Sequence, residues 1–304
     1  MSDPVSPPFV SGFAALIGRP NVGKSTLLNR ILGQKIAITS NKPQTTRNRI
    51  LGIHSSAAGQ VLFLDTPGIH RPKGRLNKFM VDQAVGACSD VDLILLLVEA
   101  GKPLDTATES IFSLLKPLTT PVFLVINKID QIAPPLLLQQ IQTYSDAFNF
   151  HQIIPVSAVS GDGVPELVRA VMTILPAGPP YYPDDQVTDL PERFIVAEMI
   201  REKIMRRTSD EIPYGVGVKV DQFEEKPDKN VIIIQATIHV ERDSHKKIII
   251  GKGGQMIKRL GQQARVDIEK LLGARVFLEL FVRIDKNWSQ NERMLRELGY
   301  SAKN

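Results

Sequence analysis

Eight consecutive residues near the start of the chain have the spacing of a phosphate-binding loop. They follow the apolar run Phe13–Ile17 and read Gly18-Arg19-Pro20-Asn21-Val22-Gly23-Lys24-Ser25, and a helical pattern follows them from Thr26. A Gly-x-x-x-x-Gly-Lys-Ser segment between a strand and a helix lets backbone N–H groups surround a phosphate at the helix N-terminus. Lys24 can reach the outer phosphates, and the Ser25 hydroxyl is placed for Mg²⁺. We therefore predict nucleoside triphosphate contacts from Gly18 through Thr26.

A carboxylate for the metal side of this site follows the next buried strand pattern. The apolar run Val61–Leu64 leads into Asp65-Thr66-Pro67-Gly68-Ile69. Asp65 ends the run, and a carboxylate in that position can reach a metal ion beside the γ-phosphate. We predict that all five residues of this segment contact the nucleotide and that Asp65 faces Mg²⁺.

A third segment carries the signal for the base. Asn127-Lys128-Ile129-Asp130 follows the run Pro121–Ile126, at the edge where open α/β sheets bind ligands. Asp130 can accept both N1–H and N2–H of guanine, a donor pair that adenine lacks, so GTP is favoured over ATP. Asn127 and Lys128 would hold the loops and lie along the base. Ser157-Ala158, after the run Ile153–Val156, could place a backbone N–H on the guanine O6.

A polar loop between the first two segments offers one more metal ligand. It contains Gln44-Thr45-Thr46-Arg47, and a threonine here could complete Mg²⁺ coordination when the γ-phosphate is present. We favour Thr46 over Thr45, and an ordinary threonine-rich turn stays open as the alternative. The predicted metal ligands are then Ser25, Thr46 and Asp65, and the predicted catalytic residues are Lys24, Thr46 and Gly68.

The elements that must position these segments alternate between buried strands and helical patterns. The strand-like runs are Phe13–Ile17, Val61–Leu64, Leu93–Val98, Pro121–Ile126 and Ile153–Val156. This βαβ rhythm predicts a mostly parallel sheet covered on both faces. The run Ile50–His54, a turn, and Val61–Leu64 together predict a hairpin, and hence one antiparallel edge strand.

A proline-rich segment divides the chain. Residues 176–191 are dense in proline and turn formers and suit an extended linker, so we predict a first domain over 1–175 and a second over 192–304. In the second domain a helix over Phe194–Arg207 is followed by strands Val216–Phe223 and Val231–Val240, two helical segments, a strand Ala274–Ile284 and a C-terminal helix. The element order αββααβ is therefore expected.

A glycine loop in the second domain lies in the most basic part of the chain. From Lys246 to Arg265 there are six basic residues and no acidic residue, and the loop Gly251-Lys252-Gly253-Gly254 falls inside that window. Such a loop lets a sugar-phosphate chain approach two helix ends closely, and this order resembles a type II KH domain, which binds single-stranded RNA. The predicted RNA-binding residues are Lys246, Lys247, Ile249, Ile250, Gly251, Lys252, Gly253, Gly254 and Lys258. We expect Ile248, Ile249 and Met256 to contact bases, and Phe277 and Phe281 to lie in the core.

Taken together, the motifs resemble the Era family of bacterial GTPases. The resemblance covers essentially the whole chain and implies an α/β P-loop GTPase domain with one antiparallel edge strand, followed by an α+β type II KH domain. It further implies binding of the 3′ region of 16S rRNA and of the 30S ribosomal subunit, with roles in small-subunit biogenesis, rRNA processing and cell-cycle progress. We expect a monomer in the cytoplasm, with peripheral contact to the inner face of the cell membrane as a further expectation.

Two residues bear on the reaction. Many small GTPases carry a water-orienting glutamine where this chain has Ile69, and isoleucine cannot hydrogen-bond to water, so slow intrinsic turnover is predicted. In related GTPases an asparagine at the position of Asn21 helps bind K⁺ beside the phosphates. K⁺ binding and a loop-shaping role for Asn21 stay equally open.

Composition limits the remaining possibilities. The chain has 304 residues, a net charge of +5 and one cysteine, so an internal disulfide is excluded. The six-residue run Leu93–Val98 is the longest apolar run, too short for a membrane span, and the N-terminus lacks a basic signal-peptide start. Two alternatives stay open: an RNA-binding scaffold with a structural nucleotide and negligible turnover, and a P-loop ATPase or kinase, which the segment Asn127–Asp130 disfavours.

Overall fold

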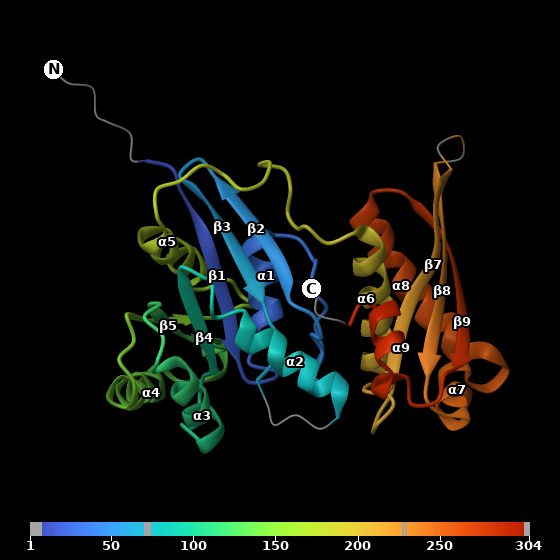
Figure 1. Ribbon diagram of the computed structural model, residues 1–304, viewed down its shortest axis with the longest axis horizontal. Helices are drawn as coiled ribbons and strands as arrows, with labels where there is room; N and C mark the ends of the chain where they lie inside the picture. Colours follow the sequence, from blue (N-terminus) through green and yellow to red (C-terminus); the bar gives the residue numbers. More distant parts are fainter. Residues whose placement is uncertain (1–7, 70–73, 227, 229, 301–304) are drawn as a thin grey trace. The chain divides into compact units, whose positions relative to one another are not determined.

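The computed structural model describes residues 8–69, 74–226, 228 and 230–300 (Figure 1). Its described residues fall into two compact units. Among the described residues, the first takes in 8–36, 46–69 and 80–189, and the second takes in 37–45, 74–79 and those from 190 to 300. The sequence patterns did not predict that residues 37–45 would group with the second unit.

The first unit is built on a six-stranded sheet. Its strands are β1 (Val10–Gly18), β2 (Ile50–Ser56), β3 (Gly59–Asp65), β4 (Leu93–Glu99), β5 (Val122–Asn127) and β6 (Gln152–Val156). The order is β2-β3-β1-β4-β5-β6, in which β2 pairs antiparallel with β3 and the other neighbours pair in parallel. The predicted mostly parallel sheet with one antiparallel edge strand is confirmed. The parallel strands end at one edge, which brings the motif segments together.

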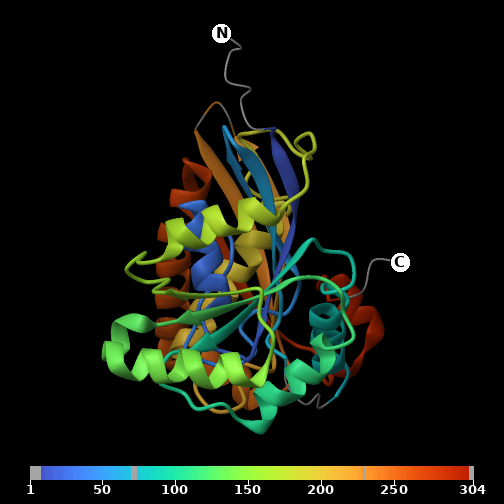
Figure 2. The ribbon, with the colours of Figure 1, turned by 90° about the vertical axis from the view of Figure 1, so that its left-hand side faces the viewer.

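Helices cover the faces of this sheet because its inner strands are apolar on both sides. In β4, for example, all residues from Leu93 to Val98 are buried. The helices are α1 (Lys24–Leu32), α2 (Arg75–Gly86), α3 (Thr106–Leu115), α4 (Pro134–Ala147) and α5 (Val164–Ile174), with a short 3₁₀ turn at Ile129–Gln131. Figure 2 shows α4 and α5 crossing in front of the strands of this unit.

The second unit has the predicted αββααβ order. Its elements are α6 (Glu192–Arg207), β7 (Val216–Lys226), β8 (Val231–Val240), α7 (Asp243–Ile250), α8 (Gln255–Leu272) and β9 (Arg275–Ile284), followed by α9 (Glu292–Glu297). Strand β8 is central, antiparallel to β7 and parallel to β9. Helices α6 and α8 lie along one face of the sheet (Figure 1), where alternate β8 residues such as Ile234 and Ile238 are buried.

The other face of this sheet corrects one prediction. Phe277 and Phe281 were expected in the core, but their side chains are 54% and 51% exposed. Because side chains alternate along a strand, Val276 and its even-numbered neighbours on β9 face the helices, and the two phenylalanines point away from them. Two aromatic rings are therefore available on the open face of the sheet.

The proline-rich segment is fixed to the first unit for most of its length. The backbone N–H groups of Tyr181 and Tyr182 donate to the buried Gln60 side chain, at 2.8 and 3.0 Å. Thr188 Oγ1 donates to the Leu51 carbonyl at 2.7 Å. Contacts with the first unit therefore extend along the 176–191 segment as far as Thr188. Nowhere in the described part of the chain does a helix have the length and apolar character needed to cross a membrane.

Candidate functional site

The phosphate-binding loop joins β1 to α1 and depends on two glycines. Gly23 precedes α1 with φ of 102°, and a Cβ there would lie 2.1 Å from the Asn127 side-chain nitrogen. Gly18 has φ of 143°, and its Cβ would meet the Leu97 carbonyl at 2.4 Å. A residue with a side chain would be strained at both positions, and it would collide with the Leu97 backbone from position 18 and with the Asn127 side chain from position 23. The Lys24 ammonium group is buried and donates to the Gly18 and Arg19 carbonyls at 3.1 and 3.0 Å.

Three oxygens from separate segments meet at the start of α1. Ser25 Oγ donates to Asp65 Oδ2 at 2.6 Å and lies 2.8 Å from Thr46 Oγ1. The other Asp65 oxygen is buried and has no hydrogen-bond partner among the described residues. One carboxylate and two hydroxyls suit Mg²⁺, which favours oxygen ligands and completes its shell with water and phosphate. The residues predicted as metal ligands are thus brought together, and the unpartnered oxygen fits a cation.

Burial shifts the pKa values of the two charged residues at this point, Asp65 and Lys24. Burial raises the pKa of Asp65 to about 6, and the Lys24 charge and hydrogen bonds from Ser25 and Thr46 oppose that rise. Burial likewise lowers the pKa of Lys24 to about 8, and the Asp65 charge opposes the fall. Both groups are charged most favourably when a cation lies by the carboxylate and a phosphate by the ammonium group.

The segment after Asp65 contacts the phosphate-binding loop through its backbone. The Ile69 N–H donates to the Gly18 carbonyl at 3.0 Å, and a Cβ on Gly68 would lie 2.6 Å from the Pro20 nitrogen. The Ile69 side chain packs, partly buried, against the hydrophobic core of the first unit. Residue 69 therefore offers only backbone polar groups. Residues 70–73, which follow this segment, lie outside the described residues.

Asn127 connects the phosphate side of the site to the base side. Its Nδ2 donates to the Val22 carbonyl at 2.8 Å, and its Oδ1 accepts from the Ala158 N–H at 3.0 Å. Ser157 Oγ donates to Asp130 Oδ1 at 2.6 Å, so the segments that hold both predicted base-binding residues are bonded to each other. Asn127 is 2% exposed, which makes it a structural bridge.

Several neighbours complete the first-unit site. Lys128 has φ of 71° and an ion pair with Glu99 at 2.9 Å. Asn21 also has a left-handed backbone, with φ of 65°, and Arg19 pairs with Asp105 at the surface.

One residue of the site was not predicted from the sequence. It is Arg30, whose Nε donates to the Ala158 carbonyl at 3.1 Å. No motif marks this arginine, because its role depends on α1 and the β6–α5 loop meeting in space.

The glycine loop of the second unit joins α7 to α8. Gly251, Gly253 and Gly254 have φ values of 72°, 57° and 75°, and a Cβ at either of the last two would meet no atom within 4 Å. The loop is therefore open to a close approach by a backbone. Lys252 and Lys258 are exposed, and Lys247, exposed as well, pairs with Asp243 at 2.7 Å.

One predicted RNA-binding residue is corrected by its burial. The Ile249 side chain is 0% exposed and belongs to the core of the second unit, so it is not available to a base. Its neighbour Ile248 is 47% exposed. Consecutive residues of a helix point in directions about 100° apart, which puts Ile248 outside and Ile249 inside. Met256 is partly buried and packs on the same core.

Comparison with known proteins defines the class of protein first. Residues 13–128 match a family model described as 50S ribosome-binding GTPase, and residues 211–289 match a KH domain model. The chain is thus a P-loop GTPase with a KH domain. It is 58% identical over 294 residues to the GTPase Era of Geobacter metallireducens, covering 97% of this chain and 99% of that relative. The chain belongs to the GTPase Era family.

Two solved structures are similar over nearly the whole chain. An Aquifex aeolicus Era variant bound to GDP and AlF₄⁻ has a TM-score of 0.94 at 40% identity, covering 96% of this chain and 100% of that one. An Era structure in complex with MgGDPNP and nucleotides 1506–1542 of 16S ribosomal RNA has a TM-score of 0.93 at 40% identity, covering 96% and 99%.

Replacing Asn127 by alanine should separate the two halves of the nucleotide site. Loss of two buried hydrogen bonds, at about 1–1.5 kcal/mol each, predicts a fall in GDP affinity of about a hundredfold. Titration with a fluorescent GDP analogue measures it. Asn149→Ala, an exposed asparagine of the same unit, is the matched control and should bind as the parent does. Equal affinities for both variants would contradict the bridging role.

Proposed function

We propose that this GTPase couples its nucleotide state to binding of the 3′ region of 16S rRNA during assembly of the 30S ribosomal subunit. One observation carries the proposal: an oxygen cluster suited to Mg²⁺ and an open, basic glycine loop occur in one chain. The similarity to an Era structure that contains both MgGDPNP and an rRNA fragment supports this pairing.

Each nucleotide-site residue has a role that its geometry supports. Ser25, Thr46 and Asp65 hold Mg²⁺, and the ion neutralises charge on the β- and γ-phosphates. Lys24 exchanges its bonds to the loop carbonyls for bonds to phosphate oxygens. Gly68 brings its backbone N–H close to the γ-phosphate, and Asp130 accepts from the guanine edge.

Slow turnover follows from the absence of a polar side chain at residue 69. Ile69 packs against the core, so attacking water must be oriented by backbone groups or by a partner. K⁺ binding at Asn21 is the second part of the proposal. The left-handed backbone of Asn21, with φ of 65°, fits the alternative that this residue shapes the loop, so the two roles need a direct test. A slow enzyme should hydrolyse GTP at a rate far below about one per second in the absence of K⁺ and RNA, but above the uncatalysed rate. An RNA-binding scaffold should not exceed the uncatalysed rate.

Replacing K⁺ by Na⁺ tests the role of Asn21. GTP hydrolysis should be about tenfold faster in KCl than in NaCl at equal ionic strength, because a fixed cation stabilises charge that develops in the transition state. Steady-state phosphate release in the two salts measures this. Asn21→Ala should lose the difference between the salts, whereas equal rates in the parent protein would remove K⁺ from the proposal.

The RNA side of the proposal rests on the loop between α7 and α8. Phosphates approach the glycines 251, 253 and 254, with charge from Lys246, Lys247, Lys252 and Lys258. Ile248 and Ile250 provide exposed or partly exposed apolar surface for bases, in place of the buried Ile249. Binding should weaken steeply with salt because several phosphates are neutralised.

Gly254→Asp tests the glycine loop. The carboxylate would stand against phosphate and should reduce affinity for the 16S rRNA 3′ fragment at least about a hundredfold, while GDP binding is unchanged. Gly273→Asp is a matched control, because Gly273 at the other end of α8 also has a left-handed backbone, with φ of 65°, and open space around its Cβ position. RNA binding by Gly254→Asp at the level of this control would place the groove elsewhere.

The remaining expectations are part of the same proposal. The nucleotide-binding domain spans 1–175, the linker 176–191 and the RNA-binding domain 192–304. The protein acts as a monomer in the cytoplasm, with peripheral contact to the membrane. Because Tyr181 to Thr188 are bonded to the first unit, reorientation of the domains would use residues 189–191.

A further inference from the structure

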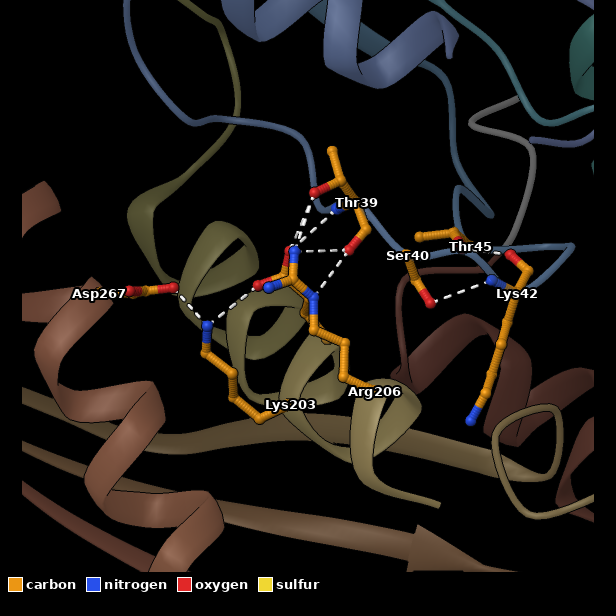
Figure 3. Close-up of polar contacts among 8 residues, drawn as sticks. Thr39, Ser40, Lys42, Thr45, Lys203, Arg206 and Asp267 are labelled. Atoms are coloured by element: carbon orange, nitrogen blue, oxygen red, sulfur yellow. Dashed lines mark hydrogen bonds and ion pairs between the residues drawn. The ribbon is translucent and has the colours of Figure 1, made fainter. Parts of the chain in front are cut away.

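The segment 37–45 lies in the second unit, although it leads directly into a predicted ligand of the nucleotide site. Thr46 follows it in the chain and belongs to the first unit, where its hydroxyl lies 2.8 Å from Ser25 Oγ. Figure 3 shows the contacts between Thr39 and Arg206 of α6, together with Lys42 and Thr45 of the segment. Three separate attachments are present, at residues 39, 42 and 45.

Both backbone polar groups of Thr39 are bonded by side chains of α6. Its N–H donates to Glu202 Oε1 at 3.0 Å, and its carbonyl accepts from Arg206 at 2.9 and 3.1 Å (Figure 3). Arg206 also pairs with Glu202 at 2.9 Å. Glu202 is fully buried, which restricts its side chain. The N–H and the carbonyl of Thr39 are therefore both hydrogen-bonded, as they would be in a β-sheet.

Lys42 caps the end of α6. Its ammonium group donates to the Met205 carbonyl at 2.5 Å and also to the Thr208 carbonyl. The last carbonyls of a helix lack partners within the helix and carry partial negative charge, so a cation there is stabilising. The Lys42 carbonyl in turn accepts from Thr45 Oγ1 at 2.7 Å, which closes the segment into a compact turn.

Arg201 holds the final residue of the segment. It is fully buried, pairs with Glu198 through two hydrogen bonds, and donates to the Thr45 carbonyl. Burial opposes its charge, but the neighbouring Glu198 carboxylate holds the pKa of Arg201 above its ordinary value. The Thr45 carbonyl belongs to the peptide unit that contains the Thr46 N–H. That unit is planar, so fixing its oxygen restricts the backbone on which Thr46 is carried.

From these contacts we infer that the polar face of α6 is a positioning site for Thr46, so that the RNA-binding unit contributes to GTP hydrolysis. This rests on the proposed role of Thr46 as a metal ligand. Holding residues 39, 42 and 45 reduces the conformations that Thr46 must lose when it engages the metal and the γ-phosphate. GDP lacks a γ-phosphate, and its affinity should not depend on α6.

Arg206 and Arg207 provide a matched pair of variants. Both are exposed arginines in the last turn of α6, but Arg207 donates to Gln263 of α8 at 2.8 Å instead of to the segment 37–45. Arg206→Met should lower kcat for GTP about fivefold, the effect of losing hydrogen bonds from a half-exposed charged donor. Its KM for GTP and its affinity for GDP should stay within about twofold, and Arg207→Met should behave as the parent. Arg206→Lys, which retains the positive charge and N–H donors on a single nitrogen, should recover part of the rate.

Thr46→Ala, alone and combined with Arg206→Met, separates this inference from the proposal beneath it. If α6 acts through Thr46, Arg206→Met will slow the parent protein but have no further effect in the Thr46→Ala background. A slow Thr46→Ala with a normal Arg206→Met would overturn the positioning role alone. A normal Thr46→Ala would overturn the role of Thr46 and this inference with it. Equal slowing by Arg206→Met and Arg207→Met, with matching losses of thermal stability, would show a structural effect and also overturn it.

Discussion

One peptide unit carries the strongest constraint in this molecule. Its oxygen, on Thr45, accepts a hydrogen bond from the buried Arg201 of the RNA-binding unit, and the residue that supplies its nitrogen, Thr46, contacts Ser25 in the nucleotide-binding unit. Because the peptide is planar, its two ends cannot be set independently. We propose that a change in the position of Thr46 on nucleotide exchange is transmitted to the contacts of the segment 37–45, and through them to α6.

The composition of α6 is consistent with such a role. Its apolar side chains, among them Ile200 and Ile204, pack in the core, while Glu198, Arg201 and Glu202 are buried on its polar side. Buried ion pairs cost desolvation energy, so apolar residues would often stabilise a helix as well or better. Charged groups do what apolar groups cannot: they bind backbone N–H and C=O groups of a segment without secondary structure.

The sequence was most informative where function depends on local spacing. The motifs at Gly18–Ser25, Asp65–Gly68 and Asn127–Asp130 each follow a strand, and parallel strands end at one edge, so their assembly could be predicted without coordinates. Burial at single positions could not be predicted in the same way. Ile249 and the two phenylalanines of β9 are decided by which face of a short element meets the core. Arg30 and Arg201 bond to carbonyls of distant segments, and no pattern near them records that contact.

In this proposal, nucleotide state and RNA binding are linked through Thr46, the segment 37–45 and α6. Its most direct test is the affinity of the intact protein for the 3′ fragment of 16S rRNA, measured with saturating Mg²⁺ and either GDPNP or GDP. Linked sites commonly change one another's affinity between about fivefold and a hundredfold, so a difference of about tenfold is predicted. Equal affinities in the two nucleotide states would contradict the account.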